Sequence, residues 1–209
     1  MSCLRGACFS LGVSVGQFEY IMALVSVIVG LGITHVLGAI GEIIHRLRGH
    51  GAPIKVDAVY LLWVASTLIW LASVWWGEYK LLTDGYVWTF GAYLFLIAYY
   101  ISLFLVVVIL VPVRMDNVAD TYEYFMGGRA WFFGAVLIAI ILDFFDTALK
   151  GAAWAFRPEY LLSQSGVYIA CCIIGWFSRN RVVQIAVAAA PFISQLAFAW
   201  QYLNVLGRW

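Results

Sequence analysis

Long runs of apolar residues recur along this chain, and they constrain its fold more than any other feature. A helix needs about 20 consecutive apolar residues to cross the hydrocarbon core of a bilayer. We expect six transmembrane helices, at about 18–46, 57–78, 87–112, 130–150, 160–178 and 181–206. Only 11% of the residues are charged, whereas a soluble domain carries roughly a quarter. The sequence therefore predicts an all-α, polytopic membrane helical bundle.

Residues 18–209 form one predicted transmembrane domain, because no polar stretch between the spans is long enough for a soluble domain. Residues 1–17 resemble a signal peptide in their positive start, but glycines interrupt their short apolar part. We expect a loose or interfacial lead-in, with a cleaved signal peptide as the alternative.

The basic residues predict the orientation in the membrane. Seven of them fall in or beside the loops after the first, third and fifth spans: Arg46, Arg48, Lys55, Arg114, Arg129, Arg179 and Arg181. Five fall on the other side: Arg5, Lys80, Lys150, Arg157 and Arg208. Because cytoplasmic loops carry the excess of Lys and Arg, we expect both termini to be periplasmic.

Three ionisable side chains lie at the end of the fourth span, in the stretch ILDFFDTALKG at residues 141–151. Asp146 and Lys150 have the i, i+4 spacing of a helical ion pair, with the acid first. Asp143 precedes Lys150 by two turns, and the Lys150 ammonium can bond one acid well or snorkel to the surface. One carboxylate is therefore left to find another partner.

Other polar residues are predicted at the same depth as these acids. They are Glu19, Glu78, Gln195 and Gln201. Together with the aspartates they predict an acidic outer-half vestibule, whose oxygen-rich and sulfur-free lining suits protons or hard cations. The alternative is that these groups pair with one another and only fix the order of the helices.

The first span carries small residues every four positions. Ser26, Gly30, Thr34 and Gly38 form this stripe, which continues to Glu42. Such a stripe lets another backbone come close. We expect this helix to be central in the bundle or to form the contact of a homo-oligomer.

His35 is predicted near the middle of the first span, where an imidazole can relay protons or simply pack through a hydrogen bond. A bis-histidine haem needs a second histidine at the same depth. His45 is ten residues further on, about 15 Å along a helix. We therefore predict no cofactor, with haem through His35 possible only across subunits or with another ligand.

The segment 115–128 differs from the spans because it is polar on one predicted helical face. Asp116, Asp120 and Glu123 share that face. We expect a short amphipathic helix lying on the inner membrane surface. Its acidic face is either solvated or a docking surface for a basic protein partner.

Several classes of function find no support in the sequence. The chain has no nucleophile–base motif, no phosphate-binding glycine loop after a strand and no HExxH, so we expect no enzyme. The formal net charge of +1 argues against nucleic acid as a partner. The four cysteines show no spacing that suits zinc.

The pattern FEYIMALVSVIVGLGITHVLGAIGEIIHR, a second span ending in WW, and GGRAWFFGAVL resemble an uncharacterised family of small polytopic proteobacterial inner membrane proteins. The resemblance covers most of the chain after residue 17. It implies a bacterial inner membrane protein and carries no site residues across.

Three hypotheses for function follow from these features. The first is passage or sensing of protons or small cations, with Asp143 and Asp146 as the acidic centre and Lys150 as counter-ion. In it Glu19 and Glu78 form the mouth, and His35 is a relay. The second is a non-catalytic membrane subunit or scaffold that docks through 115–128. The third is a membrane redox protein using His35 and the pair Trp75–Trp76, which otherwise anchors the helix at the membrane interface.

Overall fold

The computed structural model describes residues 16–83 and 88–203, which form helices joined by loops. The helices are α1 (Gln17–Leu47), α2 (Ala58–Gly77), α3 (Tyr79–Thr83), α4 (Phe90–Leu110), α5 (Thr121–Lys150), α6 (Ala152–Ala155), α7 (Pro158–Tyr160), the π-helical turn η1 (Leu161–Gly166), α8 (Val167–Phe177) and α9 (Arg181–Tyr202). Most of the predicted lead-in lies outside the described residues.

Six helical segments of the described chain are long and apolar enough to cross a membrane. They are Phe18–Leu47, Ala58–Leu81, Phe90–Leu110, Thr121–Lys150, Pro158–Phe177 and Arg181–Tyr202. The prediction of an all-α bundle with six spans is confirmed. The fourth span is longer than expected, because α5 begins at Thr121.

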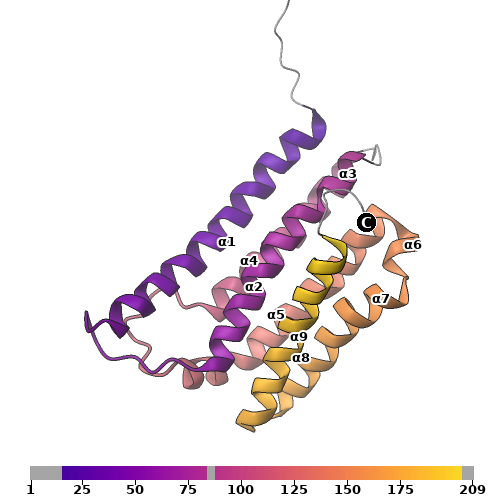
Figure 1. Ribbon diagram of the computed structural model, residues 1–209. Coiled ribbons are helices and arrows are strands. Elements are labelled where there is room, and N and C mark those ends of the chain that lie inside the picture. Colours follow the sequence, from indigo (N-terminus) through magenta and orange to yellow (C-terminus); the bar gives the residue numbers. More distant parts are fainter. Residues whose placement is uncertain (1–15, 84–87, 204–209) are drawn as a thin grey trace, which may run out of the picture.

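Successive spans run in opposite directions, so the bundle has two distinct ends (Figure 1). We call the end at which α1 begins and α9 finishes the terminal end. The opposite end, which carries residues 48–57, 111–120 and 178–180, is the loop end. This arrangement places the C-terminal turns of α2, α5 and α9 together at the terminal end.

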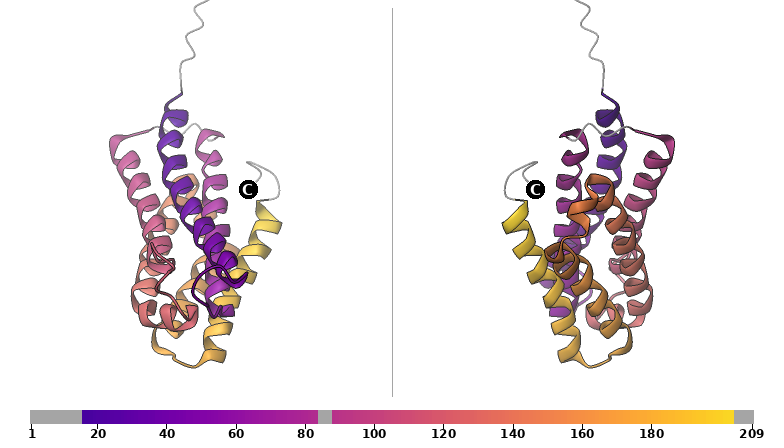
Figure 2. Two further views of the ribbon diagram at one scale, coloured as in Figure 1. Left: turned by 90° about the vertical axis from the view of Figure 1, so that its left-hand side faces the viewer. Right: turned by 90° about the vertical axis from the view of Figure 1, so that its right-hand side faces the viewer.

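The helix α1 lies at the edge of the bundle, where it packs on α4 and α2. Figure 2 shows it in front of the other helices when the bundle is viewed from that side. The remaining pairs pack α5 between α4 and α8, and α9 against α2 and α8. The expected central position of α1 is therefore wrong, since other spans form the middle of the bundle.

Aromatic side chains fill the centre of the bundle. The rings of Phe132 and Phe133 lie edge-on to Trp63, with centroid distances of 5.0 and 5.7 Å. Helix α8 reaches this layer through Gly175, because a Cβ atom there would lie 2.3 Å from Phe133 Cζ. The absence of a side chain at this position therefore sets the close approach of α8 to α5.

The expected interfacial helix at 115–128 is not a separate element. Residues 115–120 belong to a loop, and Thr121 begins the continuous helix α5. Asp120 is the N-cap of α5, where its carboxylate accepts from the backbone N–H groups of Tyr122 (2.8 Å) and Glu123 (3.3 Å). The helix continues through Gly127 and Gly128, so the amphipathic turns run directly into the fourth span.

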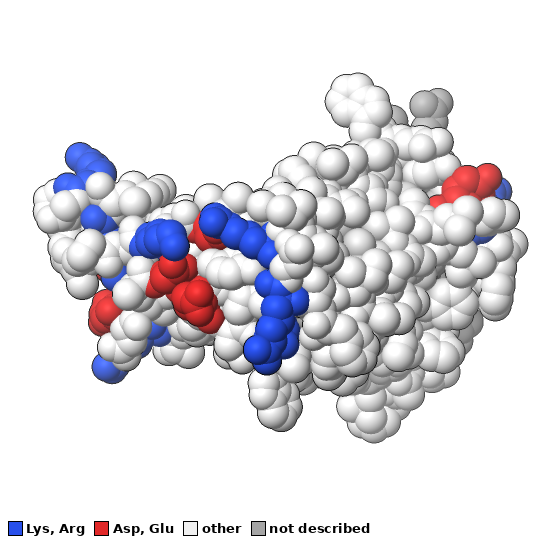
Figure 3. All heavy atoms as spheres, turned by 90° about the horizontal axis from the view of Figure 1, so that it is seen from below, with Lys and Arg blue, Asp and Glu red and all other residues white. Residues whose placement is uncertain are grey.

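The loop end is held together by polar contacts between segments that are distant in the sequence. Arg46, which is buried, donates to the carbonyl oxygens of Ala52 (2.7 Å) and Met115 (2.6 Å). Asp57, the N-cap of α2, forms an ion pair with Arg181 at the start of α9. Figure 3, seen from the loop end, shows charged side chains gathered over one part of this face.

Candidate functional site

A cluster of ionisable side chains lies inside the terminal end of the bundle. It consists of Glu78, Asp143, Asp146 and Lys150, which we call the carboxylate cluster. Helix α5 supplies the last three from one face, since they are spaced three and four residues apart. Glu78 is 0% exposed, Asp146 1% and Lys150 8%. These charges are therefore removed from bulk water.

Lys150 binds two of the three acids. Its Nζ donates to Asp146 Oδ2, which confirms the predicted i, i+4 pair, and to Glu78 Oε1 at 3.0 Å. The Tyr100 hydroxyl donates to the same Glu78 oxygen at 2.9 Å. The prediction that Lys150 bonds one acid or snorkels outward is wrong, because Glu78 from α2 faces it inside the bundle.

Asp143 is bound by tyrosines. The hydroxyl of Tyr99 donates to its Oδ1 at 2.5 Å, and the hydroxyl of Tyr160 donates to its Oδ2 at 2.7 Å. Thr147 lies 2.9 Å from the same Tyr160 hydroxyl. None of the ion pairs formed between described residues includes Asp143. Neutral donors thus bind this acid in place of a cation.

Two carboxylate oxygens of the cluster are buried without a hydrogen-bond partner among the described residues. They are Glu78 Oε2 and Asp146 Oδ1. The cluster has three carboxyl groups and one ammonium group, which pairs with two of them, so the fully ionised cluster carries an excess of two negative charges. Burying an unpaired charge in a membrane protein costs several kcal/mol. The cluster therefore has both the charge and the free acceptors to take up a positive species.

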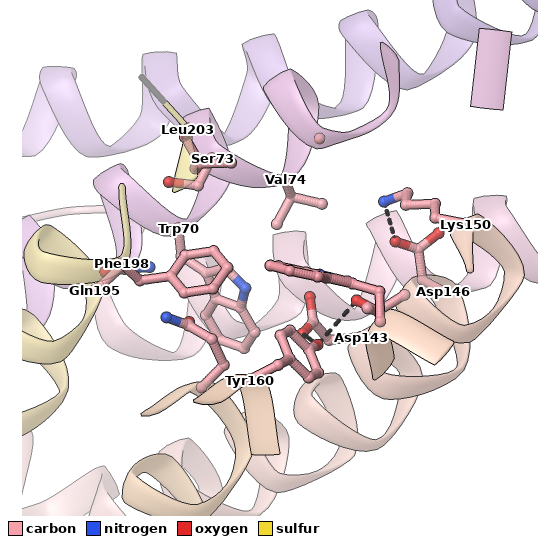
Figure 4. Close-up of a pocket in the computed structure, with 14 residues that line it drawn as sticks. Trp70, Ser73, Val74, Asp143, Asp146, Lys150, Tyr160, Gln195, Phe198 and Leu203 are labelled. Atoms are coloured by element: carbon pink, nitrogen blue, oxygen red, sulfur yellow. Dashed lines mark hydrogen bonds and ion pairs between the residues drawn. The ribbon is translucent and has the colours of Figure 1, made fainter. Parts of the chain in front are cut away.

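A cavity of about 70 Å³ adjoins the cluster, and we call it the acidic cavity. Its polar lining includes Asp143, Asp146, Lys150 and Gln164. Its aromatic lining consists of Trp70, Trp154, Tyr160 and Phe198. Figure 4 shows Tyr160 bonded to Asp143 beside the cavity, with Lys150 bonded to Asp146. The space is large enough for several water molecules or a few heavy atoms of a ligand.

Gln195 lies at the acidic cavity, as predicted from its depth. It is buried in α9, one turn after Pro191. With its amide nitrogen turned to the acceptors, it donates to the Ser66 carbonyl (3.0 Å) and accepts from the Trp70 backbone N–H (3.1 Å). Gln195 therefore ties α9 to α2 beside the cluster.

Glu19 lies away from the carboxylate cluster. It is exposed in the first turn of α1 and accepts from the Gly16 N–H at 3.0 Å. Its carboxylate thus satisfies an amide at the start of α1, and the structure does not bring it to the mouth of the acidic cavity.

His35 also lies apart from the cluster, near the loop end. Its Nε2 lies 2.9 Å from the Val111 carbonyl oxygen, so Nε2 carries a proton and donates. Val111 follows Tyr99 by 12 residues, which is about 18 Å along a helix. His35 satisfies the carbonyl that ends α4, and the structure does not connect it to Asp143.

The small-residue stripe of α1 is exposed in the single chain. A Cβ atom added at Gly30 or Gly38 would meet nothing within 4 Å. Thr34 is exposed as well, and Ser26 accepts from the Trp75 indole N–H at 3.0 Å. The stripe is therefore not covered within one chain, and its role in a homo-oligomer stays a prediction.

The three acids of the segment 115–128 do not share a helical face. Asp116 is exposed in the loop, and Glu123 is exposed in the first turn of α5. Asp120 caps that helix and pairs with Lys55 at 2.7 Å. This hydrogen bond is the main cause of the lowered pKa of Asp120 and of the raised pKa of Lys55. The predicted acidic docking face is therefore not formed as expected.

Sequence reasoning missed the neutral partners of the cluster. Tyr99, Tyr100 and Tyr160 donate to its carboxylates, and Gln164 lines its cavity. Adjacent tyrosines in an otherwise apolar span were a usable sign, since a buried tyrosine hydroxyl usually finds a polar partner. The identity of that partner depends on which helices meet, and periodicity along one helix does not contain that information.

The architecture defines the chain as an integral, multi-pass membrane protein. Comparison with protein-family models, with curated proteins and with solved structures finds no match. Among the described residues, no group of three or more His, Cys, Asp or Glu side chains is placed to hold a metal ion.

Proposed function

We propose that this membrane protein takes up a proton or a small cation into the carboxylate cluster and either senses it or passes it on. The observation that carries the proposal is that the cluster has three carboxyl groups, two of them buried and one partly buried, and only one ammonium group. Glu78 Oε2 and Asp146 Oδ1 are the free acceptors of this cluster. A bound positive species would lower the electrostatic cost of burying them.

Entry is proposed from the terminal end. Gly77, Lys150 and Leu203, which lie at or beside the last turns of α2, α5 and α9, line the acidic cavity. On the other side, a small void lined by Trp63, Ser66, Thr67 and Tyr168 among others has about 0 Å³ of space for water. The proposed site is thus open toward one side, and passage through the bundle requires the aromatic layer to move.

The cluster residues have distinct proposed roles. Lys150 is a fixed counter-ion, because it is bonded to both Glu78 and Asp146. Asp146 and Asp143 face the cavity and are the groups that the incoming species reaches first. Tyr99, Tyr100 and Tyr160 hold two of the carboxylates by neutral hydrogen bonds, which fixes their geometry without cancelling their charge.

Proton uptake by the purified protein tests this proposal. The full chain is reconstituted in liposomes that hold a pH-sensitive dye, and uptake or flux is followed after a pH step. We expect a signal that is lost in Asp143→Asn and Asp146→Asn. Glu123→Gln is the matched control, because Glu123 is an exposed acid of the same helix far from the cluster. Uptake that is unchanged in both aspartate variants contradicts the proposal.

The geometry of the described residues gives no support to the scaffold and redox hypotheses. The scaffold hypothesis relied on an acidic helical face that the loop at 115–120 divides. The redox hypothesis relied on His35 and the tryptophan pair, but His35 is bonded to Val111 and Trp75 to Ser26. Neither arrangement points to a partner or to a redox group.

A further inference from the structure

We infer that the acidic cavity binds a small primary organic ammonium ion with a neighbouring oxygen acceptor, of which ethanolamine is the simplest example. This inference rests on the proposed uptake of a positive species by the same cluster and names its chemical class. It is argued from three features of the cavity: its aromatic wall, its free polar atoms and its size.

The aromatic wall distinguishes this cavity from a metal site. Tyr160 and Phe198 have ring centroids 6.3 Å apart, Phe198 and Tyr202 5.0 Å, and Tyr202 and Trp154 5.2 Å. Tyr160, Phe198 and Trp154 line the cavity, Tyr202 packs behind them, and Trp70 lines the cavity from α2. Aromatic faces attract organic ammonium ions. Metal ions prefer several oxygen ligands instead.

Trp154 already makes a contact with a cation of the chain itself. The guanidinium carbon of the exposed Arg157 lies 4.9 Å from the centroid of a Trp154 ring. The aromatic contacts of a ligand are therefore expected from Trp70, Tyr160 and Phe198, which also line the cavity. Inside the cavity, the carboxylates add the charge that an ammonium group requires.

Two free polar atoms define the ligand further. Asp146 Oδ1 is an acceptor in a side chain that is 1% exposed, and Gln164 Nε2 is a buried donor, both without a partner among the described residues. Both residues line the acidic cavity. An ammonium N–H satisfies the first atom, and an oxygen of the same ligand satisfies the second. A primary amino alcohol supplies both groups.

The size of the cavity agrees with a ligand of a few heavy atoms. A volume of about 70 Å³ holds more than a proton and less than an extended metabolite. Ethanolamine is available either as the free amine or as the headgroup of a lipid. The chemistry that the cavity recognises is the same in both cases, so the experiment separates the two sources.

Calorimetric titration of the full chain with ethanolamine tests the inference. Free ethanolamine is added to the protein in detergent, and the protein is titrated in parallel in vesicles with and without ethanolamine phospholipid. We expect saturable binding that propanol, which lacks the charge, and potassium do not reproduce. Binding of free ethanolamine would show that the free amine is a ligand. Binding that occurs only in vesicles with ethanolamine phospholipid would show that the ligand is the lipid headgroup.

Variants connect this binding to the cavity. Loss of a hydrogen bond to a charged group costs about 1.5 kcal/mol or more, so Asp146→Asn is expected to weaken binding about tenfold. Because Asp146 also pairs with Lys150, Trp70→Leu and Gln164→Leu serve as further variants. Trp70→Leu is expected to weaken binding about fivefold. Trp131→Leu is the control, since Trp131 is 78% exposed on the outer face of α5.

The outcomes separate this inference from the proposed function. Proton uptake that depends on Asp143, without any binding of ethanolamine, overturns the inference and leaves the proposed function standing. Potassium binding as tight as ethanolamine binding also overturns it, because the aromatic wall then gives no selectivity. Absence of both proton uptake and ethanolamine binding overturns the two together.

Discussion

Lys150 is the residue on which the charge balance of the cluster depends. Its ammonium is bonded to Asp146 on its own helix and to Glu78 on α2. Buried ion pairs gain little over apolar residues of similar volume, but removal of one partner leaves an uncompensated charge. Substitution of Lys150 is therefore expected to destabilise the protein more than substitution of an exposed lysine of the same chain.

The variant Lys150→Met is expected to lower the free energy of unfolding by about 3–5 kcal/mol, because Glu78 and Asp146 lose their counter-ion. The measurement is denaturant unfolding in detergent followed by circular dichroism. The triple variant Lys150→Met, Glu78→Gln, Asp146→Asn removes all of these charges and is expected to recover most of the loss. A single variant as stable as the unsubstituted protein refutes this account of Lys150.

Part of this residue-scale picture was predictable. The spacing of Asp146 and Lys150 predicted their pair, because both lie on one helix and helical geometry is local. The excess of acid over base was predictable from the same stretch. The partners Glu78, Tyr99 and Tyr160 were not assigned, since they come from helices whose facing sides depend on packing across the whole bundle.

At the scale of the helical element, the spans were predictable because each one is a long apolar run that a bilayer requires to be helical. The beginning of α5 was not predictable, since the polar turns after Asp120 resembled a separate helix on the membrane surface. The capping contacts of Asp120 with Tyr122 and Glu123 start one continuous helix there. The role of small residues was also only partly predictable, because Gly175 faces the interior in α8 whereas Gly30 and Gly38 face outside in α1.

Two glycine variants test this difference between helices. Gly175→Ala places a methyl group against the Phe133 ring and is expected to destabilise the bundle by about 1–3 kcal/mol. The methyl group of Gly30→Ala would meet no atom within 4 Å in the single chain. This variant is expected to leave the free energy of unfolding unchanged or to raise it by up to about 1 kcal/mol. Both are measured by denaturant unfolding in detergent.

A third glycine variant, Gly38→Leu, tests the predicted homo-oligomer. If α1 forms the contact between chains, Gly38→Leu reduces the oligomer observed by analytical ultracentrifugation, whereas Gly175→Ala affects the fold without acting on that surface. An unchanged mass distribution in Gly38→Leu removes the stripe as an oligomer contact.

At the scale of the whole molecule, the two ends of the bundle differ in their charge. The loop end carries most of the basic residues of the described chain and ties its loops through Arg46, Lys55 and Arg181. At the terminal end, Lys150 is buried in the carboxylate cluster. This asymmetry agrees in direction with the positive-inside rule, and it predicts that the acidic cavity faces the periplasm.

Cysteine labelling in intact bacterial cells measures this orientation. In a background with Cys3 and Cys8 replaced by serine, Ala153→Cys at the terminal end is expected to react with a membrane-impermeant maleimide. His50→Cys at the loop end is expected to react only after the cells are permeabilised; both positions are exposed. The reverse pattern would show that the orientation is opposite to the predicted one. Labelling of both cysteines in intact cells would contradict the three spans that separate residues 50 and 153.

The wide turn η1 has a consequence for how this chain tolerates changes in length. It contains one residue more per turn than a regular helix, and Gly166 permits it, because a Cβ atom there would lie 3.0 Å from the Leu161 carbonyl oxygen. Deleting a single residue from 161–166 would give a more regular coil. Because the wide turn takes up the extra residue within itself, the deletion would leave the phenol of Tyr160 close to its present direction toward Asp143. The same deletion within the regular turns of α8 would rotate all preceding residues by about 100° and turn Tyr160 away from the acid. The chain is therefore expected to tolerate a loss of one residue in 161–166 better than in 167–177, although both deletions hardly change its hydropathy profile.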